Sequence, residues 1–467
     1  DQVYSLNLPS LKDNDPAGLR TKVFLSFFSL EDFSNLRNFK INADIRFRST
    51  NMVSFDFNDK HMLEFSRVPF SQLRALSISK LYGRSASLKN IRLTITNLTL
   101  AICDFDDFYL LSTDAPMLKC LHVIQFSRSA HFPNMNKSQC FLQLKKLIID
   151  DFIYILLNDF EIFLKFTPNL KQLKISANGK DLINEARWKQ LITTSLPSLS
   201  TFQFMFSCSR YKVKLSTMIQ KLEEFQSDFW RKEHRWFTEY TIADDSICIH
   251  TIPYAFKKYE LKSNSERHHN DSKSNSGTFD NVTNLVLNCK IRKKKCEYYF
   301  SNVTSLKLDG YSNSLTVEQI GRLRRIFNPF HLKYLGLSRI RGMDSSLLLK
   351  LLEKMPQLSI LSVWQDDLIK YIHDSKLCEQ LKKMVKRLYV EGREDYDLFK
   401  RDQFYEVFRN IEHFQFEASG REDLFFSLSC LPKLSTLQAK WVAVDDPKWY
   451  IPRIQNELNK QNVIYDI

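Results

Sequence analysis

Residues 168–178 read P-N-L-K-Q-L-K-I-S-A-N, and this stretch decides the fold. Leu170, Leu173 and Ile175 are separated by polar residues, so apolar and polar side chains alternate toward the end of the stretch. Such alternation is typical of a strand with one buried face. Asn178 follows where the chain is expected to turn. The stretch therefore predicts a short strand whose apolar side must be covered by neighbouring units.

The spacing L-x-x-L-x-L-x-x-N recurs along the whole chain. Its first position falls on Val3, Leu36, Leu73, Ile95, Leu118, Leu144, Leu170, Leu199, Val282, Val303, Leu332, Leu358, Val385, Ile411 and Leu434. Most neighbouring first positions lie roughly 20–29 residues apart, which is the period of leucine-rich repeats. We therefore expect an α/β leucine-rich-repeat solenoid, in which a curved parallel sheet lies inside and helices lie outside.

Prolines and helical spacing mark the boundaries within the repeats. Five units carry a proline two residues before the first position: Pro116, Pro168, Pro197, Pro356 and Pro432. Proline ends a preceding helix and biases the chain toward an extended conformation, so each strand begins at a defined place. Between strands, residues 105–112, 158–166 and 183–194 place apolar side chains three and four residues apart. This spacing predicts helices.

The chain divides into three parts by this pattern. We expect N-terminal repeat units over residues 1–204, an irregular insertion over 205–281, and C-terminal repeat units over 282–467. Residues 452–461 predict a closing helix with polar residues suited to a terminal cap. Because a solenoid grows by adding units, a chain of 467 residues fits a single architecture of this kind.

The insertion is rich in β-forming and aromatic residues. Residues 215–229 predict an amphipathic helix, residues 235–242 and 246–253 predict a hairpin, and residues 263–277 predict a flexible polar loop. Its aromatic residues include Trp230, Trp236, Phe237, Tyr240, Tyr254 and Phe256. They either form a docking element or fill the core at a break in the sheet. We favour the core, because large aromatic side chains are more often buried than exposed.

Composition limits the compartment and the class of protein. No apolar run approaches the roughly 20 residues that span a membrane, and no secretory signal is visible, so no membrane partner is expected. The nine cysteines form no C-x-x-C pair, which favours reduced thiols and a cytosolic or nuclear protein. Since the chain begins at Asp1 and a repeat follows at once, we also expect an upstream segment to be missing.

Motifs that carry catalysis are not found in the sequence. It contains no phosphate-binding glycine loop, no H-E-x-x-H and no G-x-S-x-G. His268 and His269 are adjacent but lack further candidate metal ligands. Cys120 and His122 are near neighbours of the kind that a repeat produces by accident. We therefore expect no catalytic, cofactor-binding or metal-binding residues, and a protein that is not an enzyme.

Basic residues leave a second class of partner open. The net charge is +14 and the isoelectric point lies near 9.2. The basic residues gather in three runs: Lys290 to Lys295, Arg322 to Arg325, and Lys382 to Arg387. Such runs either form a solvated face or bind nucleic acid, whose affinity would fall steeply with added salt. Nucleic acid is the less favoured partner.

The strand pattern also predicts where a partner protein would bind. Side chains alternate along a strand, so positions 3, 5 and 7 of each unit lie opposite the buried leucines. In the second half these positions hold Tyr334, Trp364, Arg387, Tyr389, Glu391, His413, Gln415 and Glu417. Trp, Tyr and Arg dominate binding hot spots, which makes Trp364 with Tyr389 the leading anchor. The alternative is that these are isolated exposed aromatic residues.

Several units resemble the repeat region of F-box/leucine-rich-repeat proteins. The resemblance rests on the units at residues 105–121, 166–179, 225–240, 279–287 (F-D-N-V-T-N-L-V-L) and 300–308 (F-S-N-V-T-S-L-K-L). It implies a leucine-rich-repeat fold and an upstream F-box that binds the Skp-type adaptor of a cullin-type ubiquitin ligase. The repeats would then hold a protein substrate, so the chain would be a substrate receptor. Two alternatives stay open: a stand-alone scaffold or inhibitor, and a basic nucleic-acid-associated repeat protein.

The sequence departs from this family in two respects. It contains no F-box, and position 9 holds Asn or Cys only in the units that begin at Ile95 and Leu170. The repeats are therefore expected to be irregular.

Overall fold

A computed structural model describes most of the regular elements of the chain. The described residues are 5–8, 37–46, 74–82, 95–127, 140–153, 156–262, 264–268, 277–288, 298–310, 316–340, 343–392, 402–418, 430–441 and 464–466. The run from Lys290 to Lys295, the expected closing helix 452–461 and the first positions Val3, Leu36 and Leu73 lie outside them.

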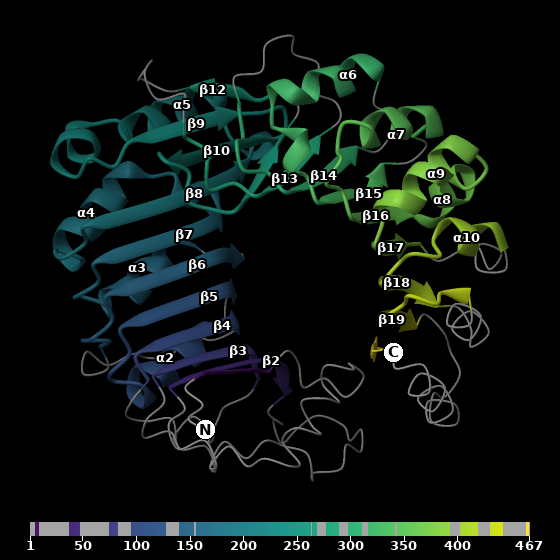
Figure 1. The fold of residues 1–467 in the computed structure, drawn as a ribbon. Coiled ribbons are helices and arrows are strands. Elements are labelled where there is room, and N and C mark those ends of the chain that lie inside the picture. Colours follow the sequence, from purple (N-terminus) through teal and green to yellow (C-terminus); the bar gives the residue numbers. More distant parts are fainter. Residues whose placement is uncertain are drawn as a thin grey trace. The chain divides into compact units, whose positions relative to one another are not determined.

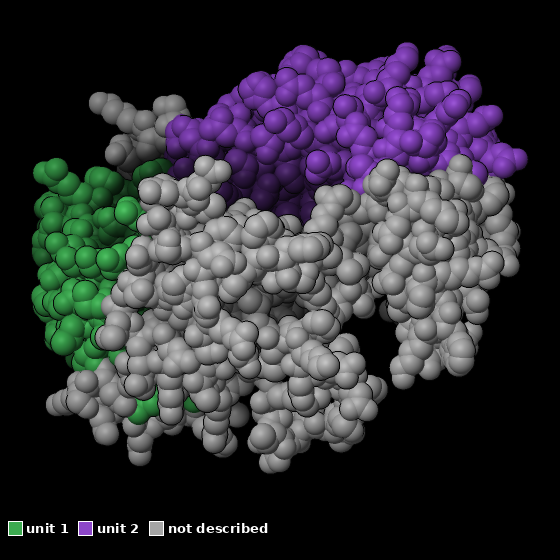
Figure 2. Space-filling view, turned by 60° about the horizontal axis from the view of Figure 1, so that its bottom comes forward, with its two compact units in different colours: residues 1–255, 268–270 green, residues 256–267, 271–467 purple. Residues whose placement is uncertain are grey.

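The chain forms two compact units (Figure 2). One comprises residues 1–255 and 268–270, and the other comprises residues 256–267 and 271–467. The expected insertion over residues 205–281 is thus shared between the units.

The first unit contains an α/β arrangement with a mainly parallel sheet (Figure 1). Its strands are β1 (Ser5–Leu8), β2 (Asn38–Arg46), β3 (Ala75–Tyr82), β4 (Asn97–Cys103), β5 (Cys120–Ser127), β6 (Lys146–Ile153), β7 (Gln172–Asn178), β8 (Thr201–Ser209), β9 (Thr238–Ile242) and β10 (Ser246–Thr251). From β1 to β8 each strand pairs in parallel with the next. Leu121, Leu147 and Leu173 are register partners, so equivalent positions of successive units are aligned.

Helices cover the apolar face of this sheet (Figure 1). They are α2 (Phe105–Asp114), α3 (Leu157–Lys165), α4 (Glu185–Ser195) and α5 (Leu215–Glu224). The first three confirm the helices predicted between strands, and α2, α3 and α4 each end shortly before a proline. The helix predicted over 215–229 is shorter than expected, since α5 ends at Glu224; a turn and then a five-residue π-helix (Phe229–Glu233) come after it. Aromatic rings fill the space between layers, with centroids only 4.0 Å apart for Phe108 and Phe163.

The insertion closes this unit with a hairpin and a set of buried rings. Strands β9 and β10 pair antiparallel, as predicted, and β10 also pairs antiparallel with β8. Trp230, Trp236, Tyr240 and Tyr254 are buried, whereas Phe237 is 43 % exposed. The Trp230 indole Nε1 donates a hydrogen bond to Glu185 Oε1 at 3.0 Å. This burial confirms that most of these aromatic residues belong to the core.

The expectation of a flexible loop over residues 263–277 is wrong for part of its length. Residues 266–268 form strand β12, and Arg267 is buried. Its guanidinium lies 5.2 Å from the centroid of the Phe279 ring and donates to Thr278 Oγ1 at 3.3 Å. A polar sequence can therefore be ordered when one long side chain finds aromatic and hydroxyl partners.

The second unit contains a wholly parallel sheet among its described strands (Figure 1). The strands are β11 (Lys258–Leu261), β13 (Asn284–Asn288), β14 (Ser305–Gly310), β15 (Tyr334–Ile340), β16 (Ile360–Trp364), β17 (Arg387–Glu391), β18 (His413–Ala418), β19 (Thr436–Trp441) and β20 (Ile464–Asp466). Each pairs in parallel with the next. Because β11 precedes Val282, parallel pairing begins earlier than the resumed repeats predict.

Helices again lie along one face of this sheet (Figure 1). They are α6 (Val317–Arg322), α7 (Ser345–Leu352), α8 (Gln365–Tyr371), α9 (Ser375–Met384) and α10 (Asp402–Val407). Thr316 and Gln319 form a capping box at α6, where Gln319 N–H donates to Thr316 Oγ1 and Thr316 N–H donates to Gln319 Oε1. Asp344 caps α7. These caps satisfy backbone N–H groups that the first helical turn leaves unpaired.

The first position of every described unit is buried. These residues are at most 6 % exposed: Ile95, Leu118, Leu144, Leu170, Leu199, Val282, Val303, Leu332, Leu358, Val385, Ile411 and Leu434. The predicted periodicity is therefore confirmed as the alignment of a core side chain from each unit. At position 9, Cys103 is buried but Asn178 is exposed, so this position is less uniform than the leucines.

Two expectations from the sequence concern the state of the cysteines and membrane-spanning segments. The seven cysteines within the described ranges are all free thiols, and Cys103 and Cys208 are buried. Within the same ranges, no helix combines the length and the apolar character that crossing a membrane requires.

Candidate functional site

The strand register places the predicted partner-binding residues on one face of the second sheet. Three rows run across the strands, and together they define what we call the polar face. The rows are Tyr334, Ile360, Arg387 and His413; then Gly336, Ser362, Tyr389 and Gln415; then Trp364 and Glu391. The row between the first two, Leu335, Leu361, Leu388 and Phe414, is fully buried on the opposite side. Alternation along the strands thus gathers residues that are far apart in sequence.

Three rings lie close together on the polar face. The Tyr389 ring centroid lies 6.5 Å from that of Tyr334 and 5.4 Å from that of His413. Gly336 gives Tyr334 its room, since a Cβ at that glycine would lie only 3.0 Å from the Tyr334 hydroxyl. The Lys307 ammonium lies 5.9 Å from the Tyr334 ring centroid, within the range of a cation–π contact. These residues come from β14, β15, β17 and β18, so only the folded sheet assembles them.

A short polar network borders the rings. The Ser362 hydroxyl donates a hydrogen bond to Glu391 Oε1 at 3.2 Å. Burial raises the pKa of Tyr334, and the nearby Glu391 carboxylate raises it further against the opposing effect of a hydrogen bond with Ser362. Tyr334 therefore keeps its proton at neutral pH and can donate it in a hydrogen bond.

His413 presents an unsatisfied polar atom at this site. Burial lowers its pKa, and the adjacent Arg387 charge lowers it further. The imidazole is therefore mainly neutral at neutral pH. Its Nε2 is buried and has no hydrogen-bond partner among the described residues. A buried polar atom without a partner costs free energy, which a bound group could recover by supplying the missing hydrogen bond.

Trp364, at the end of β16, packs closely against Gly392, the residue that directly follows β17. Gly392 has φ +124°, a conformation that favours glycine, and a Cβ there would lie 3.2 Å from Trp364 Cε2. Trp364 and Tyr389 share the polar face but stand in different rows. Both are half-buried, whereas Arg387 and Glu391 are exposed. The side chain of Glu417 lies outside the described part of the face.

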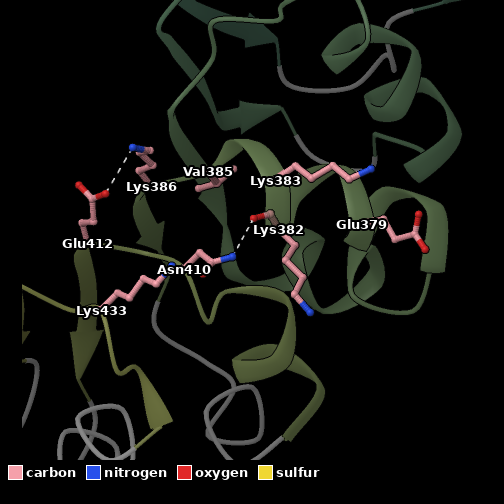
Figure 3. Close-up of a pocket in the computed structure, with 8 residues that line it drawn as sticks. All are labelled: Glu379, Lys382, Lys383, Val385, Lys386, Asn410, Glu412 and Lys433. Carbon is pink, nitrogen blue, oxygen red and sulfur yellow. Dashed lines mark hydrogen bonds and ion pairs between the residues drawn. The ribbon is translucent and has the colours of Figure 1, made fainter.

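A basic groove adjoins the polar face at the start of the same strands (Figure 3). Its volume is about 470 Å³, and it is lined by Glu379, Lys382, Lys383, Val385, Lys386, Asn410, Glu412 and Lys433. Lys386 and Glu412 directly precede Arg387 and His413 of the first row. The run from Lys382 to Arg387 is evident in the sequence. Lys433 and Asn410 are not, because they come from later segments and carry no local pattern.

Titratable side chains also lie close together on the first sheet. His122 Nε2 lies 2.7 Å from Asp150 Oδ2 across β5 and β6, while Cys120 stands two residues earlier on the same strand. The pair is partly exposed, and its hydrogen bond is of the kind that side chains on adjacent strands form. Within the described ranges, no three His, Cys, Asp or Glu residues are arranged to hold a metal ion.

Comparisons with known proteins assign no family. Neither a protein-family model nor a curated protein matches the sequence. Among solved structures, the complex of Rad7 and Elc1 in yeast aligns with TM-score 0.30 and 11 % identity, covering 79 % of this chain and 76 % of that chain. The TLR13–ssRNA13 complex aligns with TM-score 0.29 and 14 % identity, covering 88 % of this chain and 61 % of that chain. At these TM-scores neither neighbour supports an inference about fold or partners.

Proposed function

We propose that this chain is a protein-interaction module built as a leucine-rich-repeat solenoid. The parallel pairing of strands in chain order supports a solenoid, as does the buried first position of each described unit. Each unit then buries its apolar face against its neighbours and leaves the other face of the sheet available. The partner is a protein, and it binds the polar face of the second sheet.

The cluster of Tyr334, Tyr389 and His413 is the observation that carries this proposal. Its rings are close to one another and half-buried, so little side-chain freedom is lost when a partner covers them. Arg387 and Glu391 supply exposed charges at the margin. Aromatic residues surrounded by charged ones are typical of a binding hot spot with a polar rim.

In a narrower form, we propose that this partner is the substrate of a cullin-type ubiquitin ligase. The resemblance of the quoted units to F-box/leucine-rich-repeat proteins supports this form. An F-box upstream would bind the Skp-type adaptor, and the repeats would hold the substrate. The test is affinity capture with the native upstream sequence included. Co-purification of adaptor and cullin is expected, and their absence where a known F-box protein captures both would contradict the ligase role.

The polar face is tested separately, by substitution. Once a partner has been identified by cross-linking, Trp364→Ala and Tyr389→Ala are each expected to weaken its binding by about 2 kcal/mol, the size of a hot-spot contribution. Isothermal titration calorimetry would measure the change. The matched control is Phe330→Ala, since Phe330 is an aromatic residue of the same unit that is 49 % exposed and lies outside the polar face. Equal losses in all three variants would contradict the assignment of the face.

A further inference from the structure

The basic groove has more positive charge than its own carboxylates neutralise. Four lysines and two glutamates line it. Lys386 Nζ lies 3.4 Å from Glu412 Oε1, and this ion pair is visible in Figure 3. Lys382, Lys383 and Lys433 form no ion pair with any described residue. Three ammonium groups are thus left to attract an acidic ligand.

The directions of these lysines indicate an extended ligand. Lys382 and Lys383 leave the end of α9 and point in different directions, while Lys433 approaches from the segment before β19 (Figure 3). A single phosphate would require donors that converge on one point. Separated ammonium groups along an open groove instead match several acidic groups carried by one chain.

The remaining lining residues favour a protein over a nucleic acid. Among the described residues that line the groove there is no aromatic side chain on which bases could stack, and no arginine that could bind a phosphate with two hydrogen bonds. Glu379 and Glu412 can accept hydrogen bonds from the backbone N–H groups of a peptide, and a phosphodiester backbone has no such donors. Asn410 can both donate and accept, and its Nδ2 already donates to the Lys382 carbonyl at 3.4 Å.

We propose that this groove binds an acidic segment of the same protein partner that covers the polar face. The inference rests on the proposed function, because Lys386 and Glu412 connect the groove directly to Arg387 and His413 of the first row. The partner would place acidic residues in the groove and apolar or aromatic residues over Tyr389. Partner choice then depends on charge as well as on ring contacts.

The first unit has a second basic surface, and the experiment must distinguish binding there from binding in the groove. Lys119, Lys145 and Lys171 occupy equivalent places before β5, β6 and β7. Backbone hydrogen bonds show this equivalence: Lys145 N–H donates to the Lys119 carbonyl, and Lys171 N–H donates to the Lys145 carbonyl. All three are exposed. They stand one strand apart, at a spacing of about 4.8 Å.

The test uses fluorescence anisotropy on the full chain with two probes of equal net charge. One is a labelled peptide in which glutamate alternates with serine, and the other is a labelled single-stranded oligothymidylate. The groove variant is K382E/K383E/K433E. The matched control, K333E/K350E/K376E, has the same charge change at exposed lysines of the same unit, including one in the last turn of α7. A third variant, K119E/K145E/K171E, reports on the second basic surface.

The groove variant is expected to bind the peptide at least about tenfold more weakly, since three surface charges change sign. The two other variants should change peptide affinity by no more than about threefold, the effect of net charge alone. The peptide consists only of glutamate and serine, so its binding reports on the groove and does not require the rings of the polar face. This separates the groove from the proposed function, which capture of the partner tests.

Four outcomes would overturn the proposal. The peptide does not bind the native chain at low salt, or the control variant loses as much affinity as the groove variant. The K119E/K145E/K171E variant, rather than the groove variant, loses peptide affinity, which would place the binding site for the acidic peptide on the first unit. The oligothymidylate binds more tightly than the peptide and is lost in the groove variant, which would make the groove a nucleic-acid site. Circular dichroism of each variant, and the milder K382Q/K383Q/K433Q, guard against a loss caused by unfolding.

Discussion

Single glycines make room for two rings of the polar face. Gly336 leaves room for the Tyr334 hydroxyl, and Gly392 combines a positive φ with close contact to Trp364. Neither role is visible in the sequence. The role of Gly392 depends on a ring from another strand, and the role of Gly336 depends on the direction that the Tyr334 ring takes along the same strand. The repeat pattern predicts which residues face outward. It does not predict which of them pack against each other.

Gly392→Ala is expected to destabilise the protein by about 1–3 kcal/mol and to displace Trp364. The added Cβ would be strained at φ +124° and would lie 3.2 Å from Trp364 Cε2. Chemical denaturation measures the stability, and tryptophan fluorescence reports a change in the surroundings of the Trp364 ring. Gly321→Ala is the control, since no atom lies within 4 Å of its added Cβ and alanine favours a helix. A Gly392→Ala protein as stable as that control would contradict the packing.

Asp107 predicts a dependence of stability on pH. It shares a capping box with Asp104 at the start of α2. Burial, together with the nearby charge of Asp104, raises the pKa of Asp107 from 3.8 to about 7. Between about pH 4 and 7 the unfolded chain has lost a proton that the folded chain retains, so stability falls as the pH rises through this window.

Asp107→Asn should remove this dependence and make the protein more stable than the native chain above pH 7. Asparagine keeps the shape and an acceptor oxygen but cannot ionise. Urea denaturation at pH 5 and at pH 8 provides the comparison. If the variant and the native chain lose the same stability between these two values, the dependence has another origin.

Helix α3 shows how an element combines local pattern with packing between units. Its apolar spacing predicts the helix, and its buried side chains include Phe160 and Phe163. The Phe163 ring contacts rings from α2 and β5, with centroid distances of 4.0 Å to Phe108 and 5.5 Å to Phe126. The sequence predicts that Phe163 is apolar and inward, but its partners follow from the register of neighbouring units.

Phe163→Ala is expected to cost about 3–5 kcal/mol, because it removes a ring from the centre of this cluster and leaves a cavity. Ile162→Ala on the same helix should change stability by about 0.5 kcal/mol or less, since Ile162 is 40 % exposed. Thermal unfolding of both variants provides the measurement. Similar melting temperatures for the two would contradict the assigned core face of α3.

Elements that depend on long-range contacts were the ones the sequence could not predict. The proline boundaries and the buried first positions are local patterns, and the described residues have them where they were predicted. Strand β12 depends on Arg267 meeting Phe279, and the groove depends on Lys433 meeting α9. Such contacts join segments whose own sequences give no sign of one another. The polar face was predictable because strand alternation is a local rule.

Across the whole molecule, two sheets present rows of side chains whose spacing the backbone fixes. A partner that covered such rows would meet residues contributed by successive units rather than by one loop. The net charge of +14 adds an attraction for acidic surfaces that acts before contact. Binding through the second sheet should therefore combine specific ring contacts with an association rate that falls as salt is added.

The most direct measurement is site-specific photo-cross-linking at position 389, followed by identification of the protein attached. The account predicts one partner protein that cross-links at position 389 and not at Ser346, an exposed position on α7. It also predicts that Trp364→Ala abolishes most of this cross-link. The account would be contradicted by the same products at both positions, or by a cross-link at 389 that Trp364→Ala leaves unchanged.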